Sequence, residues 1–440
     1  MLKRKSRLAW LVFFMCGLLF MAGCGNDNAA PPASNSVTYN GNGSINGTVP
    51  AGSTNYEQGA TVTVLGNTGN LVKTGYAFAG WNTQADGSGT TYMQGQTFTM
   101  GSANIALYAK WTAAGYAYVA NLNNNVSQYM IGADGSLTPM ASPTVAAGSG
   151  PSSVTVDPSG KYVYVANQTD NNVSQYTIGA DGSLTPMATP TVAAGITPTS
   201  VTVDPSGKYV YVANQTDNNV SQYTIGADGS LTPMATPTVA AGITPISVTV
   251  DPSGKYVYVA NSDDNDVSQY TIGADGSLTP MATPTVASGT TPYSVAVDPS
   301  GKYVYVANAN DGSVSQYTIG ADGSLMPMDT TAVAAGAFPT SVTVDPSGKY
   351  VYVTNQEDGN VSQYTIGAGG YLTPMATPTV AAGTGPYSVT VDLSGKYVYV
   401  ANGDGNNVSQ YTIAADGSLT PMATPTIAAG TGPVSVITAR

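Results

Sequence analysis

Histidine is absent from the 440 residues, and cysteine and charged residues are scarce. Without histidine, the chain lacks the side chain that most often transfers protons near neutral pH, which counts against ordinary acid–base catalysis. The two cysteines, Cys16 and Cys24, lie near the N-terminus, so the rest of the chain has no disulfide and no thiolate ligand for zinc. Only 13 Lys and Arg residues oppose 25 Asp and Glu residues, for a net charge of −12. This scarcity of cations argues against nucleic acid as a partner, because phosphate binding depends on clustered Lys and Arg.

One phrase, SVTVDPSGKYVYVANQTDNNVSQYTIGADGSLTP, fills the last three-quarters of the chain in repeated copies. Its first serine recurs every 47 residues, at Ser153, Ser200, Ser247, Ser294, Ser341, Ser388 and Ser435. Each copy holds the segments SVTV, KYVYVAN and NVSQYTI and a weaker LTPMATPTVAAG, all enriched in residues that favour strands. Turn sequences such as DPSG and GADGS separate them. Four strands per repeat predict the blade of a β-propeller.

The two ends of the repeat array complement each other. It begins inside the phrase at Tyr116 and stops inside it at Arg440, so the last copy supplies the front that the first copy lacks. We therefore predict an all-β fold over residues 116–440: seven blades, closed by one C-terminal and three N-terminal strands in a shared blade. A β-solenoid is the alternative, but it would need polar caps at both ends, and the chain has none.

The repeated YVAN, which becomes YVTN at residues 352–355, follows SVxVDPSGKY and resembles the YVTN-type propeller repeat over residues 116–440. That family includes bacterial and archaeal surface proteins, and its superfamily includes lactonase-like propellers. The resemblance therefore implies either a surface scaffold or an enzyme. Lactonase-like relatives are expected to use His, Glu and Arg near the channel. Here histidine is absent, Glu357 is the only glutamate of the propeller and Arg440 its only arginine, so the catalytic set cannot be carried over.

The first 23 residues have the pattern of an export signal: Lys3, Arg4, Lys5 and Arg7, then an apolar stretch. Ala22-Gly23-Cys24 resembles a bacterial lipobox, which implies a lipid on Cys24 and attachment to a membrane. The alternative is an ordinary signal with an incidental cysteine. Residues 24–36 have the polar, Pro-containing composition of a flexible tether. We expect a lipid-anchored protein of the cell envelope, at the outer membrane or cell surface.

Residues 37–111 form a second module. Its segments GYAFAGW (residues 75–81) and LYAKW (residues 107–111) resemble the Listeria–Bacteroides repeat, also called the internalin B-repeat. The resemblance implies a small β-grasp-like domain common in bacterial surface proteins. In so small a domain, Trp81 and Trp111 are expected to share the core. The linker at residues 112–115 is too short for free motion, which predicts that module and propeller behave as one body.

The copies differ mainly in two sets of loops that a propeller places on one face, around the channel mouth. If the propeller binds a ligand, this face is where it should bind, although surface loops also drift when nothing constrains them. The candidate residues on it are Asp170, Asp217, Asp263, Asp264, Asp266, Tyr293, Asp311, Glu357, Asp358, Tyr387 and Asp404. Within this set, Asp263, Asp264 and Asp266 are weak candidates for calcium, without the distal glutamate of an EF-hand loop. No other cofactor is predicted.

Near-identical blades present the same side chains repeatedly, whereas a catalytic site needs different residues around one reacting atom. We therefore predict a non-enzymatic, lipid-anchored scaffold for adhesion or envelope assembly. Its expected partners are the membrane and a protein or glycan, and we expect a monomer. The alternative is a lactonase-like hydrolase of the periplasm or cell surface, in which aspartates replace the missing catalytic set.

Overall fold

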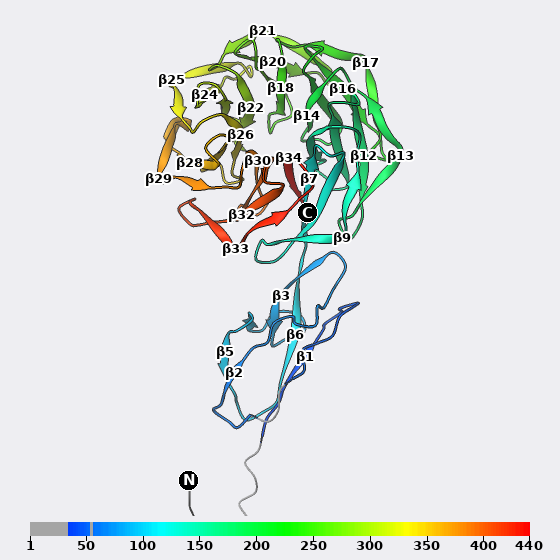
Figure 1. The fold of residues 1–440 in the computed structure, drawn as a ribbon, viewed down its shortest axis with the longest axis vertical. Helices are drawn as coiled ribbons and strands as arrows, with labels where there is room; N and C mark the ends of the chain where they lie inside the picture. The colour runs from blue at the N-terminus through cyan, green and yellow to red at the C-terminus, as the bar shows by residue number, and fades with distance from the viewer. Residues whose placement is uncertain (1–33, 53–55) are drawn as a thin grey trace, which may run out of the picture.

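The computed structural model describes residues 34–52 and 56–440, and its regular structure there is β-strand apart from one short 3-10 segment, η1 (Ala368–Gly370). Seven four-stranded antiparallel sheets surround a common axis as propeller blades, and a smaller β-domain lies beside one blade (Figure 1). The predicted all-β fold class with a seven-bladed propeller is therefore confirmed.

Six blades are continuous in the chain, and their four strands run in order from the axis outward. Three of them are formed by β10 (Pro151–Val156), β11 (Tyr162–Asn167), β12 (Asn172–Ile178) and β13 (Leu184–Ala193); β14 (Pro198–Val203), β15 (Tyr209–Asn214), β16 (Asn219–Ile225) and β17 (Leu231–Ala240); and β18 (Pro245–Val250), β19 (Tyr256–Asn261), β20 (Asp266–Ile272) and β21 (Leu278–Ala287). The other three are formed by β22 (Pro292–Val297), β23 (Tyr303–Asn308), β24 (Ser313–Ile319) and β25 (Leu325–Ala334); β26 (Pro339–Val344), β27 (Tyr350–Asn355), β28 (Asn360–Ile366) and β29 (Leu372–Ala381); and β30 (Pro386–Val391), β31 (Tyr397–Asn402), β32 (Asn407–Ile413) and β33 (Leu419–Ala428).

The seventh blade closes the ring as predicted. Its strand order is β34 (Pro433–Ala439), β7 (Gly115–Asn121), β8 (Asn125–Ile131) and β9 (Leu137–Ala146). Val436 of β34 pairs with Val119 of β7 in antiparallel register. The end of the chain is thus the innermost strand of a blade that the front of the array began.

Buried polar side chains link each blade to the next. In the third strand, Gln175 accepts a hydrogen bond from the Leu231 amide of the following blade at 2.6 Å, and its own amide group donates to Thr189 O at 3.0 Å. The equivalent Gln410 accepts from Leu137 N at 2.6 Å and joins the last continuous blade to the closing one. Because these glutamines are about 1% exposed, their hydrogen bonds have little competition from water.

The DPSG turns between first and second strands have a structural role. Asp157 accepts from the backbone amides of Ser159, Lys161 and Tyr162 at 2.7–2.9 Å, and its carboxylate is buried. The aspartate of each later copy bonds in the same way, for example Asp251 with Lys255 N and Tyr256 N. One carboxylate thereby satisfies several amides that the tight turn would otherwise leave unpaired.

The N-terminal module has a mixed sheet, ordered β1 (Val37–Asn40), β6 (Ile105–Ala113), β3 (Tyr76–Asn82) and β4 (Thr91–Tyr92), and a separate pair, β2 (Thr61–Thr63) with β5 (Thr97–Thr99). β1 runs parallel to β6, whereas β3 runs antiparallel to it. Trp81 is fully buried and donates to Leu65 O, and Trp111 packs against the same core, as expected. A single residue, Ala114, separates β6 from β7, and its amide donates to Gly75 O of the module.

Two predictions concern residues outside the described part of the chain: the signal peptide at residues 1–23 and lipidation at Cys24. Most of the predicted tether also lies outside it. They stay predictions. Within residues 34–52 and 56–440, the structure contains no helix of the length and apolarity needed to span a membrane.

Candidate functional site

A pocket of about 330 Å³ opens on the propeller axis where the first strands of all seven blades begin. Each first strand contributes two adjacent residues to it. We call the first set the variable ring; it consists of Ser152, Thr199, Ile246, Tyr293, Thr340, Tyr387 and Val434. We call the second set the serine ring; it consists of Ser153, Ser200, Ser247, Ser294, Ser341, Ser388 and Ser435.

A β-bulge places the variable ring in this pocket. In each blade the pairing of first and second strands shifts between the leading proline and the serine, for example between Pro151 and Ser153, so the intervening residue is extra. Such bulges redirect a side chain without ending the strand. All seven variable-ring side chains are thereby brought to the channel mouth, although 47 residues separate each from the next.

The serine ring forms a circle of hydrogen bonds around the axis. Ser153 Oγ accepts from Val201 N of the next blade at 3.2 Å, and the pattern continues until Ser435 Oγ accepts from Val154 N at 3.2 Å. In the described part of the chain no acceptor is found for the protons of these hydroxyls, which leaves them free to donate into the channel. The floor of the pocket therefore offers O–H donors and no charge.

The sevenfold repetition is broken most strongly at two tyrosines. Tyr293 of β22 and Tyr387 of β30 lie two blades apart, and their hydroxyls hydrogen bond to each other. Their rings pack edge to face, with centroids 5.8 Å apart, and Phe338 packs against Tyr293 at 6.1 Å. Thr340 of the intervening blade is only 3% exposed, whereas the corresponding Thr199 is half-buried. The tyrosine pair thus lies in the sector of the channel mouth where the variable-ring residue between the two tyrosines, Thr340, is buried.

Both tyrosines keep their protons over the whole physiological range. Burial raises the pKa of the Tyr293 and Tyr387 phenols above the ordinary value, and the neighbouring Tyr293 raises that of Tyr387 further. A phenol with a raised pKa is a hydrogen-bond donor near neutral pH and not a base. The other lining residues are Ser, Thr, Gln, Ile, Leu and Val, so no group in the pocket ionises near pH 7.

The predicted candidates separate into two groups in the structure. Tyr293 and Tyr387 meet in the channel pocket, whereas the acidic candidates lie outside its lining: Asp266 is half-buried at the start of β20, and the others lie in exposed loops. Five of these carboxylates accept a backbone amide from the loop that leads into their own blade: Asp170 from Ser149, Asp217 from Ile196, Asp264 from Ile243, Asp311 from Thr290 and Asp358 from Ala337. Each of these five aspartates therefore stabilises a loop through one carboxylate oxygen, and its role as a binding residue stays a prediction.

The calcium candidates do not form a metal site. Asp263 accepts from the Thr244 hydroxyl, Asp264 from Ile243 N, and Asp266 from the Asn261 side chain at 2.6 Å. Their oxygens are thus directed at three different donors. Across residues 34–52 and 56–440 no group of three or more His, Cys, Asp or Glu side chains could hold a metal ion. This geometry does not support the weak calcium prediction, which stays a prediction.

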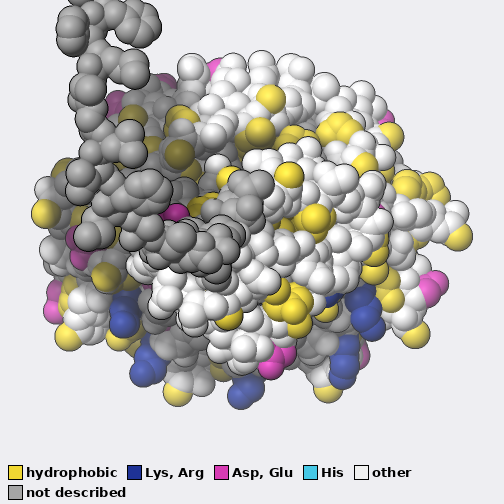
Figure 2. Space-filling model, turned by 90° about the horizontal axis from the view of Figure 1, so that it is seen from below, with side chains coloured by type: hydrophobic (Ala, Val, Ile, Leu, Met, Phe, Trp, Pro, Cys, Tyr) yellow, Lys and Arg dark blue, Asp and Glu magenta, His cyan; other side chains and the backbone are white. Residues whose placement is uncertain are grey.

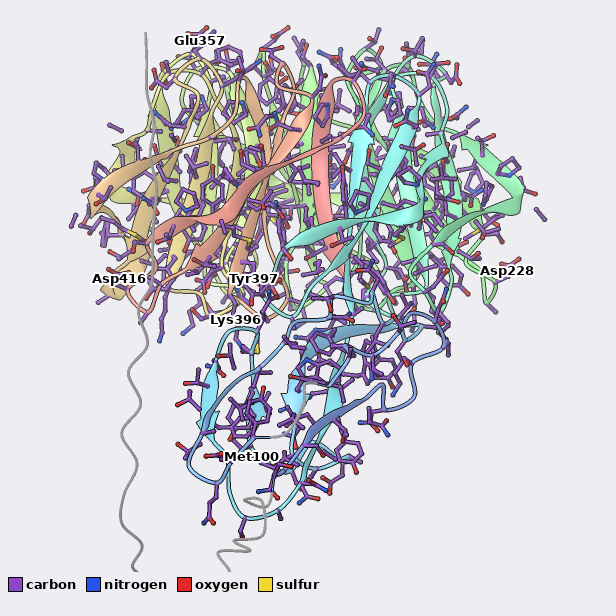
Figure 3. The ribbon with its side chains drawn as sticks, turned by 60° about the horizontal axis from the view of Figure 1, so that its bottom comes forward. Met100, Asp228, Glu357, Lys396, Tyr397 and Asp416 are labelled. Atoms are coloured by element: carbon purple, nitrogen blue, oxygen red, sulfur yellow. The ribbon has the colours of Figure 1, made fainter. Side chains whose placement is uncertain are left out.

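Glu357 and Arg440 cannot contribute to one site. Glu357 lies in the loops of the face that carries the pocket, whereas Lys396, Asp228 and Asp416 lie at the opposite face (Figure 3). Arg440 lines hollows with Asp392 and with Asp157, in the turns of that opposite face. The repeated lysines also follow these turns, and Figure 2 shows the basic side chains along one rim. The channel mouth therefore has no cation among its lining residues.

Sequence reasoning named two of the fourteen ring residues as site candidates. The residue just before each repeated serine differs between the copies, and this variation in the sequence is the signal that points to the variable ring. The serines recur identically, as structural residues do, and their convergence depends on the radial arrangement of the blades. The single YVTN copy gave a second signal, at Thr354, which lies directly behind Thr340.

A family described as lactonase, seven-bladed β-propeller, matches residues 108–242, 226–336 and 327–436, well over half of the chain. The chain therefore belongs to the lactonase-type seven-bladed β-propellers. Residues 36–110 match the Listeria–Bacteroides repeat domain. Both resemblances found in the sequence are confirmed.

Solved structures agree on the fold. A provisionally named 6-phosphogluconolactonase from Bacteroides fragilis is 23% identical, with a TM-score of 0.66 over 74% of this chain and 98% of its own. A periplasmic gluconolactonase from Pseudomonas aeruginosa is 20% identical, with a TM-score of 0.64 over 74% and 99%. These identities are low, and the similarity establishes the propeller architecture.

Two curated relatives come from Evansella cellulosilytica and are provisionally named as membrane proteins, one of them Gly-rich. The Gly-rich protein is 47% identical over 60 residues, which is 13% of this chain and 7% of the relative. The other is 38% identical over 104 residues, 24% of this chain and 14% of the relative. The chain thus spans a small part of the length of each. Their names and the repeat domain hint at a surface or envelope location.

Family membership corrects the prediction of a non-enzymatic scaffold. The matching family and the neighbours named as lactonases support the lactonase-like alternative better. The missing histidine favours a scaffold in the sequence alone, whereas the blade pattern that places the chain in the family does not depend on that residue. These neighbours are distant relatives at about 20% identity. The expected protein or glycan partner and the monomeric state stay predictions.

Proposed function

We propose that this chain is a lactonase-like hydrolase that opens an uncharged lactone at the channel mouth. One observation carries the proposal: in a propeller of the lactonase family, one ring of residues that lines this pocket differs from blade to blade. A site that acts on one carbonyl group needs unlike side chains around it, and the variable ring supplies them.

The charge of the pocket selects the substrate class. Its lining contains hydroxyl, amide and apolar groups and no Lys or Arg, so a phosphate or carboxylate on the substrate would enter without a counter-ion. An uncharged sugar lactone carries a carbonyl oxygen that accepts hydrogen bonds and hydroxyls that can pair with Ser, Thr and Gln. Hydrolysis creates a carboxylate in the same uncharged pocket, which favours its release.

The chemistry available to these residues is stabilisation of developing charge. Hydroxide ion from the solvent attacks the carbonyl carbon, and the carbonyl oxygen becomes an oxyanion in the tetrahedral intermediate. Phenol and serine O–H donors at the mouth are suited to bind that oxygen. The bond from the carbonyl carbon to the ring oxygen then breaks, and the ring oxygen takes a proton from water, which gives a hydroxy acid. No general base is invoked, so the rate should rise with hydroxide concentration and show no inflection near pH 7.

The experiment is hydrolysis of glucono-δ-lactone, followed by acid release above the spontaneous rate, with its 6-phosphate ester as the charged comparison. We expect acceleration of the uncharged lactone only, and a roughly 10–100-fold loss of kcat/KM in the double variant Tyr293→Phe, Tyr387→Phe, which removes both hydroxyls and keeps the rings. The matched control is Tyr371→Phe, on an exposed tyrosine away from the pocket. An uncharged lactone hydrolysed no faster than in buffer, or a double variant as active as the wild type, would overturn the proposal.

We also propose that the protein is exported and held in the cell envelope through Cys24. The support is the lipobox pattern in the sequence, the repeat domain of bacterial surface proteins and the names of the two relatives. Metabolic labelling with an alkyne fatty acid should mark the wild type and leave Cys24→Ser unlabelled. Equal labelling of both proteins would contradict lipidation at this residue.

A further inference from the structure

Thr354 is the one polar residue at a position where the other six blades have alanine: Ala120, Ala166, Ala213, Ala260, Ala307 and Ala401. The position is fully buried in every blade. A methyl group is therefore enough for packing there, and a hydroxyl destabilises the fold unless it finds a hydrogen-bond partner. The added oxygen in this blade calls for an explanation other than packing.

The Thr354 hydroxyl lies where three strands meet. Its Oγ1 is 3.1 Å from Oγ1 of Thr340 in β26, and it also lies 3.4 Å from Ser341 O and 3.5 Å from Tyr387 O in β30. Thr340 in turn donates to Pro386 O at 3.2 Å. The two threonines thus connect β27 and β26 to the first two residues of β30, the second of which is Tyr387.

Two other blades have a hydroxyl in the variable ring but no threonine at the position of Thr354. Ser152 donates to Ala166 O at 3.2 Å and to Pro198 O at 2.8 Å, and Thr199 bonds to the corresponding carbonyls. Those hydroxyls are half-buried at the channel mouth, whereas Thr340 is buried. In the blade of Thr354, the Thr354 hydroxyl takes the place that the carbonyl oxygens of Ala166 and Ala213 have as partners of Ser152 and Thr199.

We infer that Thr354 is a positioning residue that, through Thr340 and the start of β30, holds Tyr387 against Tyr293 and so keeps one sector of the channel mouth closed. A bound substrate would then lie over the open sector formed by Ser152, Thr199, Ile246 and Val434, with its carbonyl oxygen toward the tyrosine pair at the edge of that sector. The effect on substrate rests on the proposed function, whereas the effect on the tyrosine pair does not.

The first test measures the tyrosine pair without any substrate. Photo-oxidation with a ruthenium complex and persulfate removes one electron and one proton from each phenol, and adjacent phenoxyl radicals couple to dityrosine. In the wild type we expect a cross-linked peptide joining Tyr293 and Tyr387, identified by mass spectrometry. In Thr354→Ala its yield should fall about fivefold, the population change that loss of one ordinary hydrogen bond produces. Thr354→Ser keeps the hydroxyl and should restore the yield.

We expect the Thr354→Ala protein to fold, because the substitution introduces the residue that the other six blades have at this position. Equal cross-linking in the wild type, Thr354→Ala and Thr354→Ser would overturn the inference whatever the activity. The second test is steady-state hydrolysis of glucono-δ-lactone, in which Thr354→Ala should lower kcat/KM severalfold, because it displaces a phenol placed as an oxyanion donor, and Thr354→Ser should restore it. Cross-linking that depends on Thr354 in a wild type without lactonase activity would refute the proposed function and leave the positioning role standing.

Discussion

At the scale of single residues, chemically similar side chains have different tasks according to their place in the blade. The aspartates of the loops between second and third strands resemble binding or calcium groups in the sequence, but five of them accept an amide of the loop that leads into their own blade. The next blade has Gly405 at the equivalent position and Asp404 one residue earlier. Among the described residues, none donates a hydrogen bond to the Asp404 carboxylate.

Asp264 and Asp404 therefore provide a matched pair of substitutions. Asp264→Ala removes the 2.6 Å hydrogen bond from Ile243 N, and we expect a loss of about 0.5–1.5 kcal/mol in the free energy of unfolding. Amide hydrogen exchange at Ile243 should become faster. Asp404→Ala should change neither quantity. The comparison requires urea unfolding and exchange mass spectrometry, and equal effects of the two substitutions would refute the loop-stabilising role.

At the scale of elements, each third strand has a bulge at which a glutamine turns from its own sheet toward the next blade. Pairing of β32 with β33 shifts between Ser409 and Tyr411, and the intervening Gln410 bonds Thr424 O within the blade and Leu137 N beyond it. The bulge thus makes a contact between blades that a regular ladder would not allow. Seven such contacts make each blade depend on its neighbours.

Gln410→Leu tests the contact that joins the two ends of the ring. The substitution leaves the buried Leu137 amide and Thr424 carbonyl without partners, and we expect a loss of about 2–4 kcal/mol in the free energy of unfolding. Thr412→Val, on a half-buried threonine of the same strand whose long hydrogen bond to Thr420 O is open to solvent, should shift it by less than about 0.5 kcal/mol. Denaturant unfolding measures both. A Gln410→Leu protein as stable as the control would show that water or repacking satisfies these groups.

At the scale of the whole molecule, many tyrosine side chains of the propeller are buried between neighbouring blades with their hydroxyls protonated. Tyr176 is 2% exposed and donates to Ala146 O of the preceding blade at 2.7 Å, and burial raises its pKa to about 12. Its equivalents Tyr223, Tyr364 and Tyr411 have the same environment and the same raised pKa. An unfolded tyrosine ionises near pH 10, so the folded state binds these protons more tightly than the unfolded state.

Stability should therefore fall at alkaline pH. Below about pH 10 these phenols are protonated in both states, and their contribution to the free energy of unfolding is complete. Between about pH 10 and 12 a phenol is ionised in the unfolded state and protonated in the folded state. Over that range each such phenol lowers the free energy of unfolding by about 1.4 kcal/mol per pH unit. We expect cooperative unfolding before pH 12, with tyrosinate absorbance appearing together with loss of the fold. Thermal melts at about pH 8, 10 and 11 and absorbance near 295 nm would measure it. Gradual ionisation in a protein that stays folded would contradict this account.

The sequence by itself determined the strands, the seven blades and the closure of the ring. These features follow from local patterns: strand-forming segments between DPSG and GADGS turns, a constant 47-residue spacing, and two ends that complete one phrase. It also indicated both domain families through the segments GYAFAGW, LYAKW and YVAN.

Only the tertiary structure decided which side chains share a site. Tyr293 and Tyr387 are 94 residues apart and meet because their bulged first strands converge on the axis, whereas the loop aspartates face the backbone of their own blades. The prediction of function was wrong for a related reason. The absence of histidine is a property of the composition, and composition does not show that Ser, Thr and Tyr hydroxyls come together in the channel pocket. Radial convergence of repeated strands is a property of the closed ring, so no single copy of the repeat contains it.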